Sequence, residues 1–204
     1  NIGSPDEPTT PAVRRYLQQF LFDDRVIDIN ALARWLLVYG IISPFRAPKS
    51  AHAYKQIWGP GGSPLIVKGQ ELVDELQKIL GPTYMVRLGM RYQNPSLASV
   101  IDEFLKEGIE ELRLLPLYPQ YAQASTGSTV AEVMRLLSSY PCFPPLKVLP
   151  DFYDDPRFIG AFKACSTMST PIFSSPLAEE RAFSTASRQR TKATPPPGRM
   201  PSSA

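Results

Sequence analysis

Apolar residues recur at spacings of three and four along much of the chain, a pattern that predicts amphipathic helices. Such stretches cover residues 10–21, 32–40, 63–80, 94–108 and 130–137, and a further helix begins at Asp155. Thr10 is the expected N-cap of the first helix, because Pro11 follows it and suits a first turn. Gly40, Gly81 and Gly108 are expected to end the second, third and fourth helices.

Short apolar runs lie between these helices and predict strands at residues 84–90, 112–117 and 146–149. The run at 112–117 is nearly continuous, as in a strand that is covered on both faces. Strands that alternate with helices predict an α/β fold, a doubly wound parallel sheet with right-handed crossovers. Asn1 to Pro5 resembles the end of a first strand, so this strand is expected to be truncated.

Ligands of open parallel sheets bind beyond the carboxyl ends of the strands, which directs attention to residues 1–6, 91–95 and 118–128. The last of these loops ends in Ser125-Thr126-Gly127-Ser128, at the start of a predicted helix. Free backbone N–H groups there would favour an anion, as in a flavodoxin-like phosphate binder. Ordinary capping by Thr129 and Glu132 explains the same residues, and on spacing alone it is favoured.

The last forty residues differ from the rest in composition. Nineteen of residues 165–204 are Ser, Thr or Pro. Because this segment has too few large apolar residues to bury a core, we expect it to be a disordered tail. That tail holds five of the 22 basic and two of the 19 acidic side chains, which leaves residues 1–164 with 17 of each. The excess charge therefore lies in the tail, and a nucleic-acid partner is not predicted.

The chemistry is restricted by a single histidine, His52, and by two cysteines, Cys142 and Cys165. No disulfide framework, His-rich metal site or Ser-His-Asp arrangement can be built from these residues, and no apolar stretch is long enough to span a membrane. A cytoplasmic location is the expectation. Arg46, Lys49, His52 and Lys55 form a basic cluster, which either is a solvated face or presents a cationic rim to an acidic ligand.

Several motifs in combination resemble the ferrochelatase family, whose members insert ferrous iron into a porphyrin. The motifs are Asn1-Ile2-Gly3-Ser4-Pro5-Asp6, Arg14-Arg15-Tyr16-Leu17, Arg46-Ala47-Pro48-Lys49 with Tyr54, Gly61-Gly62-Ser63-Pro64-Leu65, Gly89-Met90-Arg91-Tyr92, Leu115-Pro116-Leu117-Tyr118-Pro119-Gln120-Tyr121 and Ser125-Thr126-Gly127-Ser128. They follow the family's order and spacing from residue 1 to about residue 164. The resemblance is to the N-terminal half of such an enzyme, followed by the tail at 165–204.

The resemblance implies two similar doubly wound α/β halves with the porphyrin in the cleft between them. It implies the following porphyrin-binding residues: Ile2, Arg46, Tyr54, Ser63, Arg91, Tyr92, Tyr121, Ser125 and Thr126. Aromatic and aliphatic side chains suit a flat macrocycle, whereas Arg and hydroxyl groups suit its carboxylates. The substrates implied are Fe²⁺ and protoporphyrin IX. No resident cofactor is expected, and Gln123 stands where some relatives have a cysteine, which removes the support for an iron–sulfur cluster.

The family's iron-handling histidine and its acidic partner have no counterpart in these residues, so no catalytic and no metal-ligating residue is predicted. From Cys165 the sequence is expected to leave the family, as a truncated or frame-shifted copy would. The enzyme interpretation is therefore a ferrochelatase-like lyase of haem synthesis whose chain is inactive alone. The alternative is a non-catalytic half-domain that binds a porphyrin or a partner. Peripheral contact with a membrane and the oligomeric state stay open.

Overall fold

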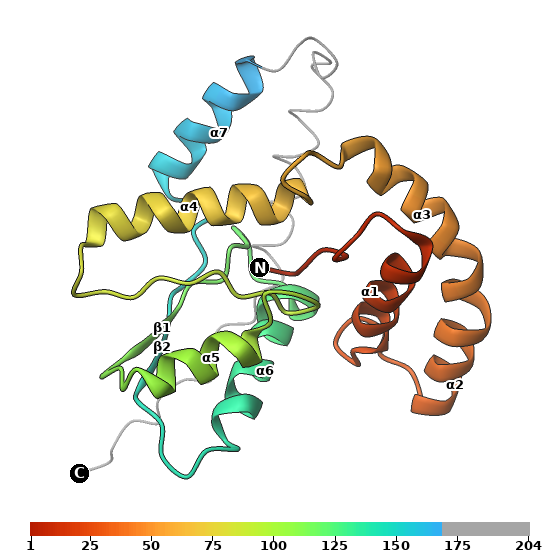
Figure 1. The fold of residues 1–204 in the computed structure, drawn as a ribbon, viewed down its shortest axis with the longest axis horizontal. Coiled ribbons are helices and arrows are strands. Elements are labelled where there is room, and N and C mark those ends of the chain that lie inside the picture. The colour runs from red at the N-terminus through yellow and green to blue at the C-terminus, as the bar shows by residue number, and fades with distance from the viewer. Residues whose placement is uncertain (169–204) are drawn as a thin grey trace, which may run out of the picture. The chain divides into compact units, whose positions relative to one another are not determined.

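The computed structural model describes residues 1–168 (Figure 1). The chain divides into two compact units. The first unit, residues 1–153, contains α1 (Thr10–Phe22), α2 (Ala31–Trp35), the π-helix η1 (Leu36–Ile42), α3 (Ser43–Ile57), α4 (Pro64–Leu80), α5 (Leu97–Lys106), β1 (Leu112–Leu114), the π-helix η2 (Gln123–Gly127), α6 (Ser128–Leu137) and β2 (Leu146–Val148). The second unit begins at Asp154 and contains α7 (Pro156–Met168). The chain thus has a mixed helix and strand structure.

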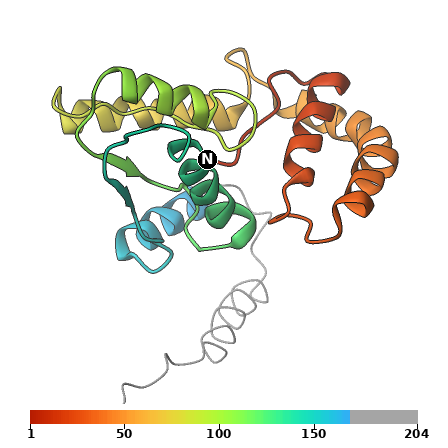
Figure 2. The same ribbon diagram turned by 90° about the horizontal axis from the view of Figure 1, so that it is seen from below.

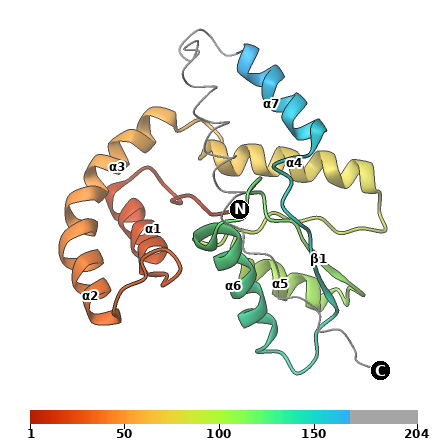
Figure 3. The same cartoon turned by 180° about the vertical axis from the view of Figure 1, so that it is seen from behind.

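The two strands pair in parallel, as the alternation of strands and helices predicts. Leu112 lies opposite Leu146, and Leu114 opposite Val148. Helices α5 and α6 lie beside this pair (Figure 3). Their apolar faces form the main core cluster with Leu112, which contains Leu97, Ile101, Phe104, Val133 and Leu137. Arg113 in the middle of β1 is exposed, so the strand is covered on one face only. The strand is also shorter than the expected 112–117.

The expected strand at 84–90 is an extended segment without a regular ladder, and this prediction is wrong. Its backbone groups bind elsewhere: the side chain of Gln77 accepts from Val86 N–H at 3.0 Å and donates to the carbonyl of Tyr84 at 2.8 Å. Further on, the carbonyl of Ile2 accepts from Tyr92 N–H at 3.0 Å, and Gly3 pairs with Tyr92 in a parallel bridge. A strand needs a continuous partner, and the hydrogen bonds of this segment are isolated ones: the carbonyl of Gly89 accepts from the amino terminus of Asn1, and Met90 pairs with residues 95–97.

Helix α1 packs against a long helix formed by α2, η1 and α3 in succession (Figure 2). Val13 on α1 is fully buried against Ala47 and Ala51 on α3. Gly40 does not end the second helix, contrary to the prediction. Pro44 has no N–H to donate to the carbonyl of Gly40 and its ring crowds that carbonyl. The helix widens into a π turn at this point, with Ser43 N–H bound to the carbonyl of Val38, and then continues as α3.

The remaining helix ends follow local chemistry. Thr9, not Thr10, is the N-cap of α1, where its hydroxyl accepts from Ala12 N–H. Ser96 caps α5 in the same way, and such caps each stabilise a helix by about 1 kcal/mol. Gly81, at φ 75°, ends α4 as predicted. No helix within residues 1–168 is both long and apolar enough to cross a membrane.

In the second unit, the Asp155 carboxylate accepts from Arg157 N–H at 2.8 Å at the predicted start of α7. Helix α7 includes residues 165–168, the first four residues of the predicted disordered tail. An apolar periodicity set by Phe158, Ile159 and Phe162 carries the helix past that point. The rest of the tail prediction, residues 169–204, lies outside the described residues.

Candidate functional site

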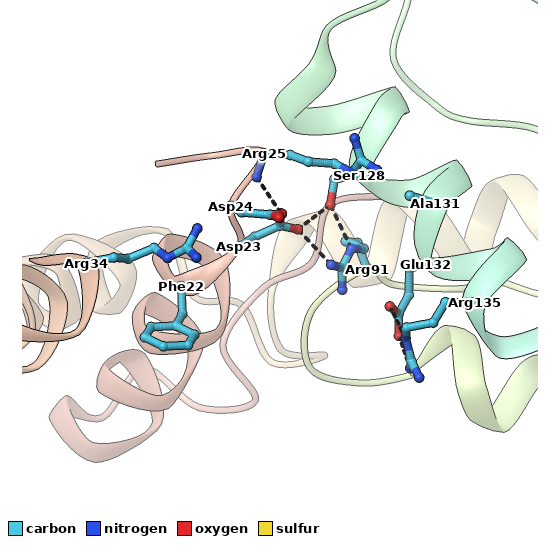
Figure 4. A pocket seen from close by; sticks show the side chains of 10 residues that line it. All are labelled: Phe22, Asp23, Asp24, Arg25, Arg34, Arg91, Ser128, Ala131, Glu132 and Arg135. Atoms are coloured by element: carbon cyan, nitrogen blue, oxygen red, sulfur yellow. Dashed lines mark hydrogen bonds and ion pairs between the residues drawn. The ribbon is translucent and has the colours of Figure 1, made fainter. Parts of the chain in front are cut away.

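A buried carboxylate, Asp23, joins three segments of the first unit that are distant in the sequence (Figure 4). It follows the last residue of α1, and its side chain is 5% exposed. Its Oδ2 atom accepts from Arg91 Nη2 at 2.7 Å, from the Tyr92 hydroxyl at 2.8 Å and from Ser128 Oγ at 2.5 Å. Asp23, Arg91, Tyr92 and Ser128 therefore form one hydrogen-bonded group, which we call the Asp23 cluster.

The cluster holds Asp23 in its ionised form. Burial by itself raises the pKa of this carboxyl, but hydrogen bonds from Ser128, from Arg25 N–H and from Tyr92, together with the charge of Arg91, lower the pKa to about 2. Burial raises the pKa of the Tyr92 hydroxyl above its ordinary value. At neutral pH the cluster thus contains a carboxylate, a guanidinium and a neutral phenol.

Two open hollows flank the cluster. The first has a volume of about 420 Å³ and is lined by Phe22, Asp23, Asp24, Arg25, Arg34, Arg91, Ser128, Ala131, Glu132 and Arg135. The second has a volume of about 810 Å³ and is lined by Arg15, Gln18, Gln19, Phe22, Asp23, Tyr39, Arg91, Tyr92, Gln93, Asn94, Ser96 and Glu132. Asp23 and Arg91 line both hollows, so the cluster lies at their common wall.

Arginine dominates the wall of the first hollow. Arg91 pairs with Asp23, and Arg135 pairs with Glu132 at 2.7 Å. Arg34 lies over the ring of Phe22, 5.4 Å from its centroid, and donates to the carbonyl of Ile27. Its buried Nε atom has no hydrogen-bond partner within residues 1–168. A wall with four guanidinium groups and three carboxylates favours an anionic ligand over a cation.

Among the residues predicted from the sequence, Arg91 and Tyr92 face the hollows. Tyr92 is only 3% exposed and Arg91 side-chain exposure is 18%, so Arg91 presents the greater polar surface. Ile2 lies beside Tyr92 and binds its N–H through the main chain. Ser63 is buried at the N-terminus of α4, where its Oγ accepts from the hydroxyl of Ser4 at 2.7 Å.

Arg46 and Tyr54 lie on α3, outside the lining of both hollows. Arg46 is exposed. Tyr54 is half-buried beside the core cluster around Val13, its ring meets that of Trp58 edge to face, and burial raises the pKa of its hydroxyl. The basic cluster predicted around Arg46 is exposed along the same helix, with His52 Nε2 3.4 Å from the amide of Gln56.

Tyr121, Ser125 and Thr126 lie on the segment before α6. Tyr121 is 64% exposed, and the Thr126 hydroxyl is buried without a hydrogen-bond partner in the described part of the chain. The predicted loop here is partly helical, because residues 123–127 form the π-helix η2. N–H groups of Ser125 and Gly127 bind the carbonyl of Ala122, and Ser128 N–H binds within η2.

These hydrogen bonds correct two predictions about the start of α6. The N–H groups of Ser125, Gly127 and Ser128 bind carbonyls of residues 122–125, so they are not the free donors expected for a phosphate at Ser125 to Ser128. The N-cap of α6 is Gly127, which has no side chain to donate or accept, so Thr129 and Glu132 do not form the expected capping box. The preference of the site for an anion comes from arginine side chains instead.

Sequence reasoning did not identify Asp23 or the role of Ser128. One local signal marks Asp23: an acidic residue at the C-terminus of a helix is unfavourable for the helix dipole and therefore requires a cation nearby. Within residues 1–168, no group of three or more His, Cys, Asp or Glu side chains is arranged to hold a metal ion.

Comparison with known proteins gives a consistent result. The sequence profile of the family named Ferrochelatase matches residues 1–172. Ferrochelatase of Legionella pneumophila (strain Corby) is 45% identical over 161 residues, which cover 79% of this chain and 48% of the relative. Ferrochelatase of Opitutus terrae is 44% identical over 179 residues (86% and 50%), and that of Coxiella burnetii (strain RSA 493) is 42% identical over 161 residues (79% and 44%). The chain spans about half the length of the curated relatives it matches.

Proposed function

Because this chain belongs to the ferrochelatase family, we propose that it supplies the porphyrin-binding half of an enzyme that inserts ferrous iron into protoporphyrin in haem synthesis. The observation that carries this proposal is the Asp23 cluster, which fixes Arg91 at the common wall of two open hollows. A guanidinium held in this way can bind a porphyrin carboxylate, and the aromatic residues nearby can contact the macrocycle.

In this proposal the porphyrin-binding residues divide by chemistry. Arg46, Ser63 and Arg91 bind carboxylates, with Ser125 and Thr126 as further hydroxyl groups. Ile2, Tyr54, Tyr92 and Tyr121 contact the flat face of the ring. The exposure of Arg46 and Tyr121 supports a role at a rim, whereas the burial of Ser63 and Tyr92 supports one at the floor.

The proposed fold of residues 1–164 is a doubly wound parallel sheet. Two features support it: β1 and β2 pair in parallel, and Gly3 forms a parallel bridge to Tyr92, at the end of the extended segment 84–92. The segments 1–3, 84–92, β1 and β2 alternate with helices, which is the order of such a sheet. Ligand-binding residues of such a sheet lie at or beyond the carboxyl ends of its strands, and Arg91 lies near the end of the segment 84–92 while Ser128 begins the helix that follows β1.

We assign no catalytic residue and no resident cofactor to this half. Iron is a substrate in this proposal, and the proposed location of the reaction is the cytoplasm. Insertion requires an acceptor for two pyrrole protons. Arginine is always protonated at neutral pH, and burial raises the pKa of Tyr54, Tyr92 and Tyr118, so that none of these groups accepts a proton readily. His52 is exposed on α3. The described residues hold and orient the macrocycle.

A second feature favours peripheral contact with a membrane. Six large apolar side chains are exposed along α2, η1 and the start of α3, and we call them the apolar patch: Leu32, Trp35, Leu36, Tyr39, Ile41 and Phe45. The exposed basic side chains of Arg46, Lys49 and Lys55 follow on the same helix. Apolar and basic residues together suit the interface of an anionic bilayer, which is also where an apolar porphyrin partitions.

The proposal is tested by mixing the 204-residue chain with protoporphyrin, and then with Fe²⁺ under anaerobic conditions. We expect a saturable shift of the Soret band on porphyrin uptake and no haem above the uncatalysed background, because the family's iron-handling histidine and its acidic partner have no counterpart in this sequence. Haem formation that disappears in His52→Ala would place the base at His52 and contradict this assignment. A chain that does not change the Soret band would contradict the porphyrin-binding function itself.

A further inference from the structure

Arg91 is held on three sides. Its Nη2 atom donates to Asp23 at 2.7 Å, its Nε atom donates to Ser128 Oγ at 2.8 Å, and its guanidinium lies over the ring of Tyr92, 4.6 Å from the centroid. Within residues 1–168, its third nitrogen, Nη1, has no hydrogen-bond partner. The guanidinium is therefore fixed in orientation while one of its NH₂ groups stays available at the wall of the hollows.

We propose that Asp23 is a positioning residue for ligand binding, which acts by holding Arg91 so that its Nη1 group receives a carboxylate of the porphyrin. This inference rests on the proposed function and adds to it a residue that touches no ligand. Asp23 is suited to the task because both of its oxygens are fixed: Oδ1 accepts from Arg25 N–H at 2.8 Å, and Oδ2 accepts from Arg91, Tyr92 and Ser128.

The charge of Asp23 matters as well as its geometry. An arginine side chain has several flexible torsions, and ordering it at the moment of binding weakens the affinity. With Asp23 in place, that ordering is complete before the ligand arrives. The carboxylate also balances the charge of Arg91, whose side chain is only 18% exposed, so that the guanidinium can remain in the wall without a ligand.

The asparagine variant separates charge from shape. Asp23→Asn keeps an oxygen for Arg25 N–H but replaces the shared acceptor with an NH₂ group, which faces three donors and releases Arg91. Ser128→Ala removes the anchor of Nε and one donor to Asp23, but it keeps the carboxylate and its bond to Arg91. We expect Asp23→Asn to weaken protoporphyrin binding by about 10- to 100-fold and Ser128→Ala by about 3- to 10-fold.

A double-mutant cycle in the full chain tests whether Asp23 acts through Arg91. Dissociation constants for protoporphyrin are measured by Soret titration for the wild type, Asp23→Asn, Arg91→Ala and the double variant, each shown to be folded by circular dichroism. If Asp23 acts through Arg91, Asp23→Asn has no further effect in the Arg91→Ala background. The dimethyl ester of protoporphyrin, which lacks the carboxylates, should bind the wild type and Asp23→Asn equally.

Losses that add in the double variant, or an equal loss with the ester, would overturn the positioning role and show that Asp23 only stabilises the fold. If Asp23→Asn is not folded, the same cycle is run with Asp23→Glu, which keeps the charge and displaces the carboxylate from Arg91, and the same criterion applies. If the wild type binds protoporphyrin no more tightly than Asp23→Asn, this inference alone is overturned. A wild type that binds no protoporphyrin overturns the proposed function, and the inference with it.

Discussion

Asp23 accepts hydrogen bonds from Arg91, Tyr92 and Ser128, which are 68, 69 and 105 positions away in the sequence. The sequence pattern identified Arg91 and Tyr92, because they follow an extended apolar segment where ligand-binding loops are expected. It could not identify the group that orients them, since a contact over such separations depends on how α1, the 91–95 loop and α6 pack. Only the unfavourable position of an acid at the end of α1 was visible beforehand.

The ionised state of Asp23 makes the stability of the chain depend on pH. Because folding lowers its pKa from 3.8 to about 2, the stabilisation is fully present well above pH 4 and is lost as the pH falls through 2. A shift of this size corresponds to about 2 kcal/mol of unfolding free energy. We expect Asp23→Asn to have a lower unfolding free energy than the wild type at pH 6. Between pH 6 and pH 2 its unfolding free energy, measured by urea titration, should fall by about 2 kcal/mol less than that of the wild type.

The matched control for this prediction is Asp24→Asn, which changes an exposed neighbour that is outside the cluster. It should keep the pH dependence of the wild type. Asp155, whose pKa is also lowered to about 2 by hydrogen bonds from Arg157, remains in all three proteins and cancels in the comparison. An unchanged slope in Asp23→Asn would contradict the hydrogen bonding assigned to the cluster.

At the scale of the elements, helices were predictable and strands were less so. The helices α1, α4, α5 and α6 have apolar residues at a spacing that fixes their exposed and buried faces locally, and each forms within a few residues of the predicted bounds. The segment 84–90 has the composition of a strand, but a strand also needs a partner, and the hydrogen bonds of Gln77 and of Asn1 to Gly3 take the place of a ladder. The π-helix η1 could not be predicted, because the sequence pattern did not indicate that the helix continues past Gly40 and through Pro44.

Gly3 and Gly40 provide a direct test of these local arguments. Gly3 has φ 119°, and a Cβ atom there would lie 2.1 Å from the carbonyl oxygen of Tyr92. A Cβ atom at Gly40, which lies inside a helix, would meet no atom within 4 Å beyond its chain neighbours and the adjoining backbone of its own helix. We expect Gly3→Ala to lower the unfolding free energy by roughly 3 kcal/mol, and Gly40→Ala to raise it by about 0.5 to 1 kcal/mol. Equal effects in chemical denaturation would contradict the backbone pairing of Gly3.

The long helix from α2 to α3 gives a second prediction at this scale. If the apolar patch and the basic residues after it contact a membrane, the chain should float with vesicles that contain anionic lipid and less with neutral vesicles. The double variant Trp35→Ser/Phe45→Ser should reduce flotation about tenfold. Leu72→Ser/Ile79→Ser, which removes exposed apolar residues from α4, should not. Equal losses in both double variants would contradict a specific membrane-facing patch.

For the whole molecule, the family could be predicted from the sequence, since its motifs are short, specific and in a fixed order; the family profile confirms it and extends to residue 172. Among the described residues the sheet has two strands, β1 and β2, and the wider doubly wound sheet is part of the proposal. The hollows could not be predicted either, because residues that line them, from Arg15 to Arg135, come from separate helices and loops. Motif order identifies candidate residues, but tertiary packing decides which of them face a common space.

The central claim, that this chain forms a porphyrin-binding half of a ferrochelatase, is tested most directly by the dissociation constant of protoporphyrin for the 204-residue chain and its Arg46→Ala variant. A charge-assisted hydrogen bond to a carboxylate contributes about 1.5 to 3 kcal/mol, so we predict saturable binding that Arg46→Ala weakens by roughly 10- to 100-fold. Lys78→Ala, an exposed cation on α4, should bind as the wild type does. The absence of saturable binding, or equal affinity in Arg46→Ala and Lys78→Ala, would contradict the account.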